Sequence, residues 1–239
     1  MLLGFGGSAA GWVAHTLMLK EDGTVWATGW NDFGQLGDGS TVAKVNFVQV
    51  ISGNVKAVAA GSRYSMVLKR DGSVWAAGQN NYGQLGDGSK TDRLNFVQVV
   101  ASGVIAVAAR YFHSMVLKAD GSVWATGSNK YGQLGDGSNT DQSSFVKVMA
   151  GGAAVAVGLG HSMVLKQDGT VWVTGWNNHG QLGDGSTVNK NSFTQVLSGG
   201  TMSLAAGYSC SMVVRQDGSV WATGSNNYGQ LGDGSSTDR

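Results

Sequence analysis

The chain has 239 residues, of which 39 are glycine, one is cysteine and none is proline. Glycine exceeds its usual share of about 7%, but the glycines do not recur at every third position, so a collagen-like chain is excluded. Sixteen Lys and Arg balance 15 Asp and Glu, and no basic cluster of the kind that nucleic-acid-binding surfaces carry is present.

Three features bear on the compartment. Cys210 is the single cysteine and cannot form an internal disulfide, which favours an intracellular setting. No run of about 18 apolar residues predicts a membrane-spanning helix. The N-terminal sequence MLLG lacks the basic region and long apolar run of a signal peptide, although a targeting segment removed earlier would leave no trace. We therefore expect a soluble, intracellular protein without direct membrane insertion, in the cytoplasm or an organelle.

An internal repeat dominates the sequence. Residues 22–40 read DGTVWATGWNDFGQLGDGS, and close copies begin at Asp71, Asp120, Asp168 and Asp217. A fixed period of roughly 20–50 residues is typical of solenoids, propellers and arrays. We therefore predict one domain, residues 1–239, made of repeats at approximately 1–50, 51–99, 100–148, 149–196 and 197–239.

Each repeat predicts four strands. In the second repeat, residues 55–60, 65–69, 73–77 and 96–100 form short apolar runs bordered by Gly, Asp, Asn or Ser. Asp71-Gly72 joins the second and third runs and predicts a tight hairpin, for which we expect a type I′ turn. Four-stranded meanders repeated in this way favour a β-propeller over a parallel β-helix, whose turns usually lack such hairpins.

The number of outer strands bears on whether the ring of blades closes. Motifs for outer strands occur at residues 47–50, 96–99, 145–148 and 193–196, and a fifth would follow Arg239, which gives 19 strands. Residues 1–5 either stand in for the missing outer strand or leave the ring open. The predicted fold is all-β: a β-propeller of five four-stranded blades, closed with an imperfect fifth blade or part of a larger ring.

The repeat carries the pattern His113-Ser114, Leu117, Asp120-Gly121, Gly127, Asn129 and Gly132-Gln133-Leu134-Gly135, with equivalents in the other copies. This pattern resembles the repeat of the regulator-of-chromosome-condensation propeller family over almost the whole chain. The resemblance implies a ring that commonly has about seven blades. Family repeats usually place an aromatic residue directly before the strand-ending glycine, whereas here Trp26 and its equivalents stand two residues earlier. We expect these tryptophans to pack between blades all the same, because a shift of two keeps the strand face.

Two motifs of the long loop resemble ion-binding or phosphate-binding sequences. Asp-x-Ser-x-x-Asp, as at Asp87 and Asp92, suggests calcium only faintly, because no bidentate Glu follows, so we expect Asx-turns. Residues 34–40 are glycine-rich but lack the Gly-Lys-Ser/Thr ending of a phosphate loop. In these loops we expect Gln35 and its equivalents to bond between blades.

One repeat position holds His15, His113 and His161, with Tyr64 and Cys210 in the other copies. Residues on separate blades do not converge on one metal ion, so we expect them to bond a neighbouring loop backbone. Cys210 has no base paired with it in the sequence, and we expect it to be buried as a small apolar residue. We predict no catalytic, metal-binding or cofactor-binding residue and no enzyme activity.

Variation among the copies concentrates in two loops of each repeat, which a meander places on one face of the disc. Aromatic and arginine side chains are enriched there, as at interface hot spots. The candidate partner-binding residues are Trp12, Trp30, Arg63, Tyr64, Arg110, Tyr111, Phe112, Trp176, His179 and Tyr208.

These features predict a non-catalytic protein-binding scaffold or a peripheral subunit of a larger complex. A complex associated with a membrane is included in this prediction. The protein partner is unidentified, and no nucleic acid is expected. Two alternatives stay open through the family resemblance: a guanine-nucleotide exchange factor or chromatin-associated regulator, and a propeller that inhibits an enzyme.

Overall fold

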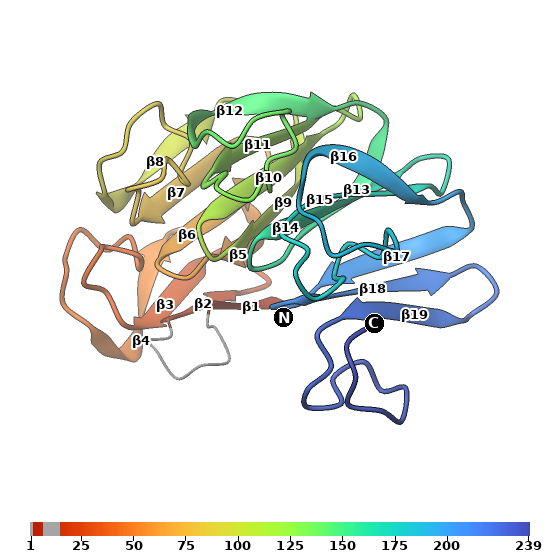
Figure 1. Cartoon of the computed structure of the whole chain (residues 1–239). Coiled ribbons are helices and arrows are strands. Elements are labelled where there is room, and N and C mark those ends of the chain that lie inside the picture. The colour runs from red at the N-terminus through yellow and green to blue at the C-terminus, as the bar shows by residue number, and fades with distance from the viewer. Residues whose placement is uncertain (1, 7–14) are drawn as a thin grey trace.

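The computed structural model describes residues 2–6 and 15–239, and in this part of the chain it forms nineteen strands in five antiparallel sheets (Figure 1). Each sheet is one blade of a β-propeller, numbered one to five along the chain. Blades one to four have four strands and blade five has three. The predicted all-β fold and the count of 19 strands are confirmed.

The strands follow one another in chain order within each blade. Their bounds are β1 (Leu2–Gly6), β2 (His15–Leu19), β3 (Val25–Gly29) and β4 (Lys44–Ile51); β5 (Val55–Ala60), β6 (Tyr64–Lys69), β7 (Val74–Gly78) and β8 (Arg93–Val100); β9 (Val104–Arg110), β10 (His113–Lys118), β11 (Val123–Gly127) and β12 (Gln142–Met149); β13 (Gly152–Val157), β14 (His161–Lys166), β15 (Val171–Gly175) and β16 (Lys190–Leu197); β17 (Thr201–Ala206), β18 (Cys210–Arg215) and β19 (Val220–Gly224).

The hairpin between the second and third strands differs from the expected type I′ turn. In blade two the N–H of Gly72 donates to the carbonyl of Lys69 at 3.1 Å, and Gly72 has φ +81°. Asp71 does not have a positive φ. The turn is therefore the three-residue type I form followed by a left-handed glycine. The Asp71 carboxylate accepts hydrogen bonds from Ser73 N and Oγ, which explains why aspartate precedes the glycine.

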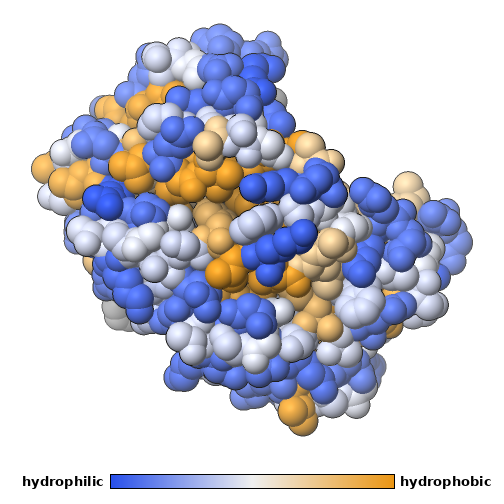
Figure 2. All heavy atoms as spheres, turned by 90° about the horizontal axis from the view of Figure 1, so that it is seen from above, coloured by the Kyte–Doolittle hydropathy of each residue, from blue (hydrophilic) through white to orange (hydrophobic). Residues whose placement is uncertain are grey.

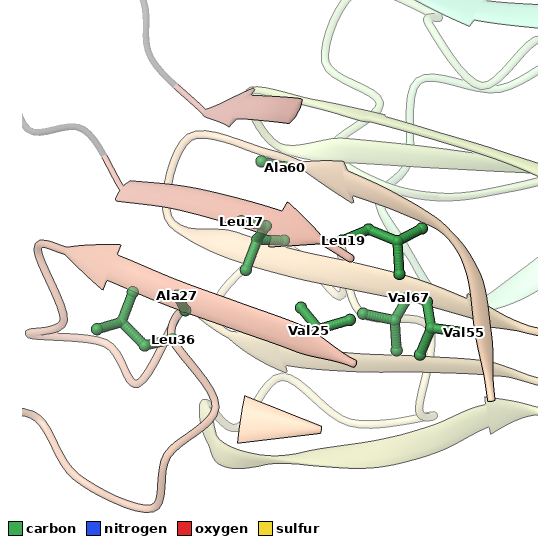
Figure 3. Close-up of a cluster of buried hydrophobic side chains, with 8 residues drawn as sticks. All are labelled: Leu17, Leu19, Val25, Ala27, Leu36, Val55, Ala60 and Val67. Atoms are coloured by element: carbon green, nitrogen blue, oxygen red, sulfur yellow. The ribbon is translucent and has the colours of Figure 1, made fainter. Parts of the chain in front are cut away.

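Apolar side chains pack between successive blades. At the interface between blades one and two, Leu17, Val25 and Ala27 face Val55 and Val67, and none is more than 1% exposed (Figure 3). Trp75 packs against this cluster and Trp124 against the next one, as predicted for the tryptophans of the repeat. The core therefore consists of four layers between blades.

Buried polar residues also join the blades. His15 Nε2 lies 2.9 Å from Ser65 Oγ in the next blade, and Ser65 Oγ donates to the carbonyl of Gln35 at 2.6 Å. Because the serine proton is used in this way, His15 Nε2 is the donor. Burial lowers the pKa of His15 to about 4, so its imidazole is neutral at pH 7. His113 with Ser162 and His161 with Ser211 repeat the arrangement at 2.9 and 3.0 Å.

Two expectations are corrected here. The histidines bond serine side chains of the next blade rather than loop backbone, because they are buried strand residues in the interfaces between blades. Gln35 bonds the next blade through its backbone carbonyl, whereas its side-chain Oε1 accepts from Phe33 N in its own loop at 3.0 Å.

The blades form an open arc in the part of the chain that the structure describes. Successive inner strands pack on one another, β1 on β5, β5 on β9, β9 on β13 and β13 on β17, and no comparable packing joins blade five to blade one. Leu2–Gly6 pairs with β2 as the inner strand of blade one. It does not stand in for the missing outer strand of blade five, so of the two alternatives for residues 1–5 the described residues fit the open ring.

Hydrophobic residues reach the surface in patches among hydrophilic ones (Figure 2). Val45 and Tyr228 are each 95% exposed, and they lie in blade one and blade five. The described residues contain no helix, and hence none long and apolar enough to cross a membrane.

Candidate partner-binding face

Aromatic residues of blades two, three and four gather around one pocket of about 420 Å³ on the loop face. Its aromatic walls are Tyr82, Tyr111, Phe112, Tyr131 and Trp176, and its remaining lining is Ser128, Lys130, Gln133, Asp141 and Leu159. Three of the predicted partner-binding residues, Tyr111, Phe112 and Trp176, thus lie together. We call this site the aromatic pocket.

The tight turn between β9 and β10 supplies one wall of the aromatic pocket. The turn consists of Tyr111 and Phe112, whose rings lie 4.2 Å apart between centroids, and the Phe112 ring lies 4.9 Å from that of Tyr82. Tyr111 has φ +51°, a strained conformation for a bulky residue. Its carbonyl accepts from Ser62 N of blade two at 3.2 Å, which helps to fix the turn.

Trp176 forms the opposite wall. Trp176 follows the end of β15, and its backbone N–H donates to the Gly160 carbonyl at 2.7 Å. Its ring lies 5.9 Å from that of Tyr131 and meets the His179 ring edge-on at 5.3 Å. His179 Nδ1 lies 2.8 Å from a carboxylate oxygen of Asp238, so this wall is tied to the loop of blade five.

The long loop between the third and fourth strands holds Tyr131 rigidly. Asn129 is fully buried; its Nδ2 donates to Asp136 Oδ1 at 3.0 Å, and its Oδ1 accepts from Leu134 N at 3.0 Å. Gln133 Oε1 accepts from Tyr131 N at 2.9 Å. The aromatic pocket therefore rests on a loop whose polar groups are internally paired.

The aspartates of the Asp-x-Ser-x-x-Asp motif serve this loop. Asp136 Oδ1 accepts from Ser138 N at 2.9 Å, the Asx-turn that the sequence predicts, and Asp141 Oδ1 accepts from Asn129 N at 2.7 Å. Burial alone would raise the pKa of Asp136, but its hydrogen bonds hold that pKa below the ordinary value. In the described residues no group of three or more His, Cys, Asp or Glu is arranged to hold a metal ion.

The aromatic pocket is mainly apolar with a polar rim. Burial raises the pKa of Tyr111, and the neighbouring Tyr208 and Tyr82 raise it further. Tyr111 is therefore a neutral phenol at physiological pH. Lys130 and Asp141 place one charge of each sign at the rim. Such a site suits an apolar or aromatic side chain.

The other predicted residues lie apart from the aromatic pocket or inside the protein. Trp30 and Phe33 meet edge-on at 5.2 Å, and the Arg63 guanidinium lies 4.9 Å from the Phe33 centroid and 5.2 Å from that of Trp30. Arg110 Nη1 reaches across to the carbonyl of Ala206 in blade five at 3.3 Å. Trp12 lies outside the described residues.

Tyr208 and Cys210 flank the turn of blade five. Tyr208 is 43% exposed, and its backbone carbonyl accepts from Leu159 N at 3.2 Å. Cys210 is half-buried, less than expected, and burial raises the pKa of its thiol.

The prediction that Tyr64 belongs to the partner-binding face is corrected by the structure. It is fully buried, its hydroxyl donates to the carbonyl of His113 at 2.6 Å, and Ser114 Oγ lies 2.8 Å away. It occupies the repeat position of the buried histidines and joins blade two to blade three. Its assignment to the exposed face is therefore wrong.

Sequence reasoning left out two walls of the aromatic pocket, Tyr82 and Tyr131. They share one repeat position with Phe33, His179 and Tyr228. That position varies among the copies, and this variation could have indicated that Tyr82 and Tyr131 belong to the partner-binding face. What the sequence could not show is that only the copies in blades two and three face a common hollow.

Comparisons with known proteins agree with this architecture. The structure of human WBSCR16 is similar with a TM-score of 0.82 and 23% identity, over 94% of this chain and 63% of that one. Prp20p from Saccharomyces cerevisiae, described with its binding to Gsp1p and histones, gives 0.75 and 20% over 87% and 53%. Kap60-bound yeast RCC1 (Prp20) gives 0.78 and 22% over 94% and 55%.

The chain therefore spans less than two thirds of the length of each of these structures. No curated protein matches it. The fold and the aromatic loop face define a repeat β-propeller. The RCC1-like domain model matches residues 7–239, and the chain belongs to that family.

Proposed function

We propose that this chain is a non-catalytic protein-binding module that holds an apolar or aromatic side chain of its partner in the aromatic pocket. The observation that carries the proposal is the convergence of five aromatic side chains from three blades on one hollow of about 420 Å³. The internal copies of the repeat differ at the positions of its five aromatic walls.

The composition of the aromatic pocket supports binding of a protein. Tyrosine and tryptophan are enriched at interface hot spots, where they present large contact areas with few rotatable bonds. The hydrogen bonds beneath Tyr111 and Tyr131 fix the walls before a partner arrives, which lowers the ordering cost of binding. Prp20p, the yeast RCC1 seen in two of the similar structures, is described as binding other proteins.

The test begins with a tagged chain, cross-linked in its native cell and purified with its partner. The identified partner is then produced alone and titrated by calorimetry against wild-type chain and the variants Tyr131→Ala and Trp176→Ala. Removal of a hot-spot aromatic costs about 2 kcal/mol or more, so we expect Kd to rise by about 30-fold.

Tyr228→Ala is the matched control. Tyr228 occupies the repeat position of Tyr131 in blade five, is 95% exposed and lies outside the aromatic pocket. Its removal is expected to leave Kd unchanged. Equal affinity of the wild-type chain and a folded Trp176→Ala variant would refute the proposal. If the partner is a small GTPase, a nucleotide-release assay separates exchange activity from binding alone.

A further inference from the structure

The turn between the first and second strands of a blade reaches back over the long loop of the preceding blade. The residue immediately before the second strand is, in blades two to five, Arg63, Phe112, Gly160 and Ser209. The Arg63 guanidinium lies 4.9 Å from the Phe33 centroid, and the Phe112 ring lies 4.9 Å from that of Tyr82. At the first two interfaces, a side chain of the following blade therefore covers the aromatic residue of the loop.

At the third interface the covering side chain is missing. Gly160 holds its position, and a methyl carbon placed on Gly160 would lie 3.3 Å from Tyr131 Cδ2 and 3.3 Å from Trp176 Cβ. Tyr131 and Trp176 are walls of the aromatic pocket. Gly160 does not have a positive φ, so its backbone does not require glycine. The position is thus aimed at Tyr131 as in the other blades, and the lack of a side chain leaves this space to the aromatic pocket.

At the two filled interfaces, the charge of the covering side chain matches the residue that precedes the loop aromatic. Asp32 precedes Phe33 in blade one, and the covering side chain there is Arg63. In blade two the preceding residue, Asn81, and the covering side chain, Phe112, are both uncharged. These interfaces therefore combine opposite charges or none.

The residue that precedes Tyr131 is Lys130, and no other copy has a cation at this position. The Lys130 ammonium lies 5.4 Å from the centroid of the Tyr131 ring, the same ring toward which Gly160 is aimed. A positive charge thus stands at the edge of the empty space. Like charges across an interface are unfavourable and complementary ones steer association, so the site disfavours a cationic occupant and favours one that brings negative charge.

The negative charge of the rim, Asp141, belongs to the other side of the aromatic pocket. Its Oδ1 accepts from the backbone N–H of its own loop at 2.7 Å, as does that of Asp238 in blade five. The second carboxylate oxygen of Asp238 lies 2.8 Å from His179 Nδ1 in the preceding blade. Tyr82 of blade two holds the position of His179, so Asp141 stands on the side of blade two, whereas Gly160 is on the side of blade four.

We propose that the space beside Gly160 takes an aromatic side chain of the partner protein, next to an acidic residue in the partner's sequence. This inference rests on the proposed function and specifies the ligand of the aromatic pocket. The ring covers Tyr131 as Phe112 covers Tyr82, and the neighbouring carboxylate meets the Lys130 ammonium. An aromatic ring is favoured over an aliphatic side chain because aromatic pairs gain energy beyond the area that they bury.

The experiment uses the whole chain and three peptides in one frame: acetyl-GDFDG-amide, acetyl-GKFKG-amide and acetyl-GDADG-amide. Binding is followed by NMR through the indole N–H signal of Trp176. We expect GDFDG to bind saturably and GDADG to bind at least about tenfold more weakly, because the ring is lost. We expect GKFKG to bind about fivefold more weakly than GDFDG, because its lysines face Lys130.

Variants of Gly160 test whether the ring enters at this position. Gly160→Phe supplies the missing side chain from the chain itself, as Phe112 does in blade three, and is expected to weaken GDFDG binding at least about tenfold. Gly160→Ala is the matched control for the loss of glycine. Its methyl group fills only a small part of the space, so we expect a loss of about twofold.

A second pair of variants tests the charge. Lys130→Gln is expected to weaken GDFDG binding about threefold and to strengthen binding of GKFKG. Asn227→Asp is the matched control, because it also lowers the net charge by one and lies at the same repeat position in blade five, outside the aromatic pocket. Asn227→Asp is expected to leave the binding of both peptides unchanged.

Two results would overturn the inference without any protein variant. One is the lack of saturable GDFDG binding at millimolar concentration, and the other is binding of GKFKG or GDADG as tight as that of GDFDG. Unaltered GDFDG binding by a folded Gly160→Phe variant would also overturn it, because the ring would then bind elsewhere. The proposed function is judged separately, by titration of the native partner against Trp176→Ala, and it stands if that partner depends on Trp176 while the peptides fail.

Discussion

The second and fourth blade interfaces are made from nearly identical sequence yet differ in completeness. Between blades two and three, Phe145 and Trp124 of blade three pack on the core. Between blades four and five, Trp221 does not pack on the core and is 54% exposed, and the given sequence ends at Arg239, before the position that Phe145 holds in its repeat. The difference teaches that each interface is finished by the outer strand of the next repeat. Stability in such arrays is a sum of nearest-neighbour terms, so we expect it to be uneven along the chain.

The largest expected effect comes from acid, because three interfaces contain a buried neutral histidine. Burial lowers the pKa of His15 and His161 to about 4 and that of His113 to about 3, from the ordinary 6.5. Below pH 6.5 the unfolded chain binds protons that the folded chain does not, so stability is full above that pH and falls as the pH drops toward 4. Each histidine costs about 2 kcal/mol at pH 5, and urea unfolding at pH 7 and 5 measures the sum.

The variant His113→Gln is the control for this prediction. A glutamine amide can still donate to Ser162, but it does not titrate. The loss of stability between pH 7 and 5 is expected to shrink by about a third. The aspartates titrate near pH 3.8 in the unfolded chain and lower in the folded chain, so they contribute little to this window. An unchanged pH dependence in the variant would contradict the assignment to buried histidine.

The second prediction compares phenylalanines that share one repeat position. Phe145→Ala removes the ring that completes the second interface and is expected to lower the free energy of unfolding by about 3 kcal/mol. Phe47 holds the same position in β4, packs on no preceding blade among the described residues and is 41% exposed. Phe47→Ala is expected to cost less than about 1 kcal/mol. Urea midpoints give both values, and equal losses would show that the phenylalanines do not act through the interface.

The sequence predicted the strands, the outer-strand motifs and the propeller class because these depend on local patterns. Short apolar runs and turn glycines recur in five copies at a spacing of 48 or 49 residues. The strand pattern found in one copy could therefore be checked against the others. The family resemblance identified from those repeats agrees with the match of residues 7–239 to the RCC1-like domain. The hairpin type was wrong because Asp-Gly fits both the two-residue and the three-residue turn.

What could not be predicted depends on contacts between repeats. The role of residues 1–5 was open in the sequence, because one short strand can extend either its own blade or its neighbour. The burial of Tyr64 was missed, although its copies His113 and His161 share the position and point into an interface. The aromatic pocket depends on which three loops converge, and this follows from the curvature of the arc rather than from any single repeat.

The third prediction concerns the only tyrosine at the histidine position. Tyr64→Phe removes a hydroxyl that donates to the His113 carbonyl at 2.6 Å, and leaves that buried carbonyl without this donor. A cost of about 1.5 kcal/mol is expected. Tyr82 is 37% exposed, and Tyr82→Phe is expected to change nothing measurable. If thermal or urea unfolding shows no difference between the two variants, the hydroxyl of Tyr64 does not stabilise the second interface.

The smallest expected effect concerns an ion pair within one blade, in contrast to the buried contacts between blades. In blade two, Arg93 forms an ion pair with Asp87 at 2.6 Å, whereas in blade three Gln142 donates to Asp136 at 3.0 Å in the same place. Arg93→Gln therefore converts one copy to the other. Because the Arg93 side chain is 36% exposed and glutamine keeps a hydrogen bond to the same carboxylate in blade three, we expect a loss of at most about 0.5 kcal/mol that shrinks further in 1 M NaCl. A loss above about 2 kcal/mol, as for a buried pair, would mean that the charge of Arg93, and not only its hydrogen bond, holds the long loop of blade two against β8.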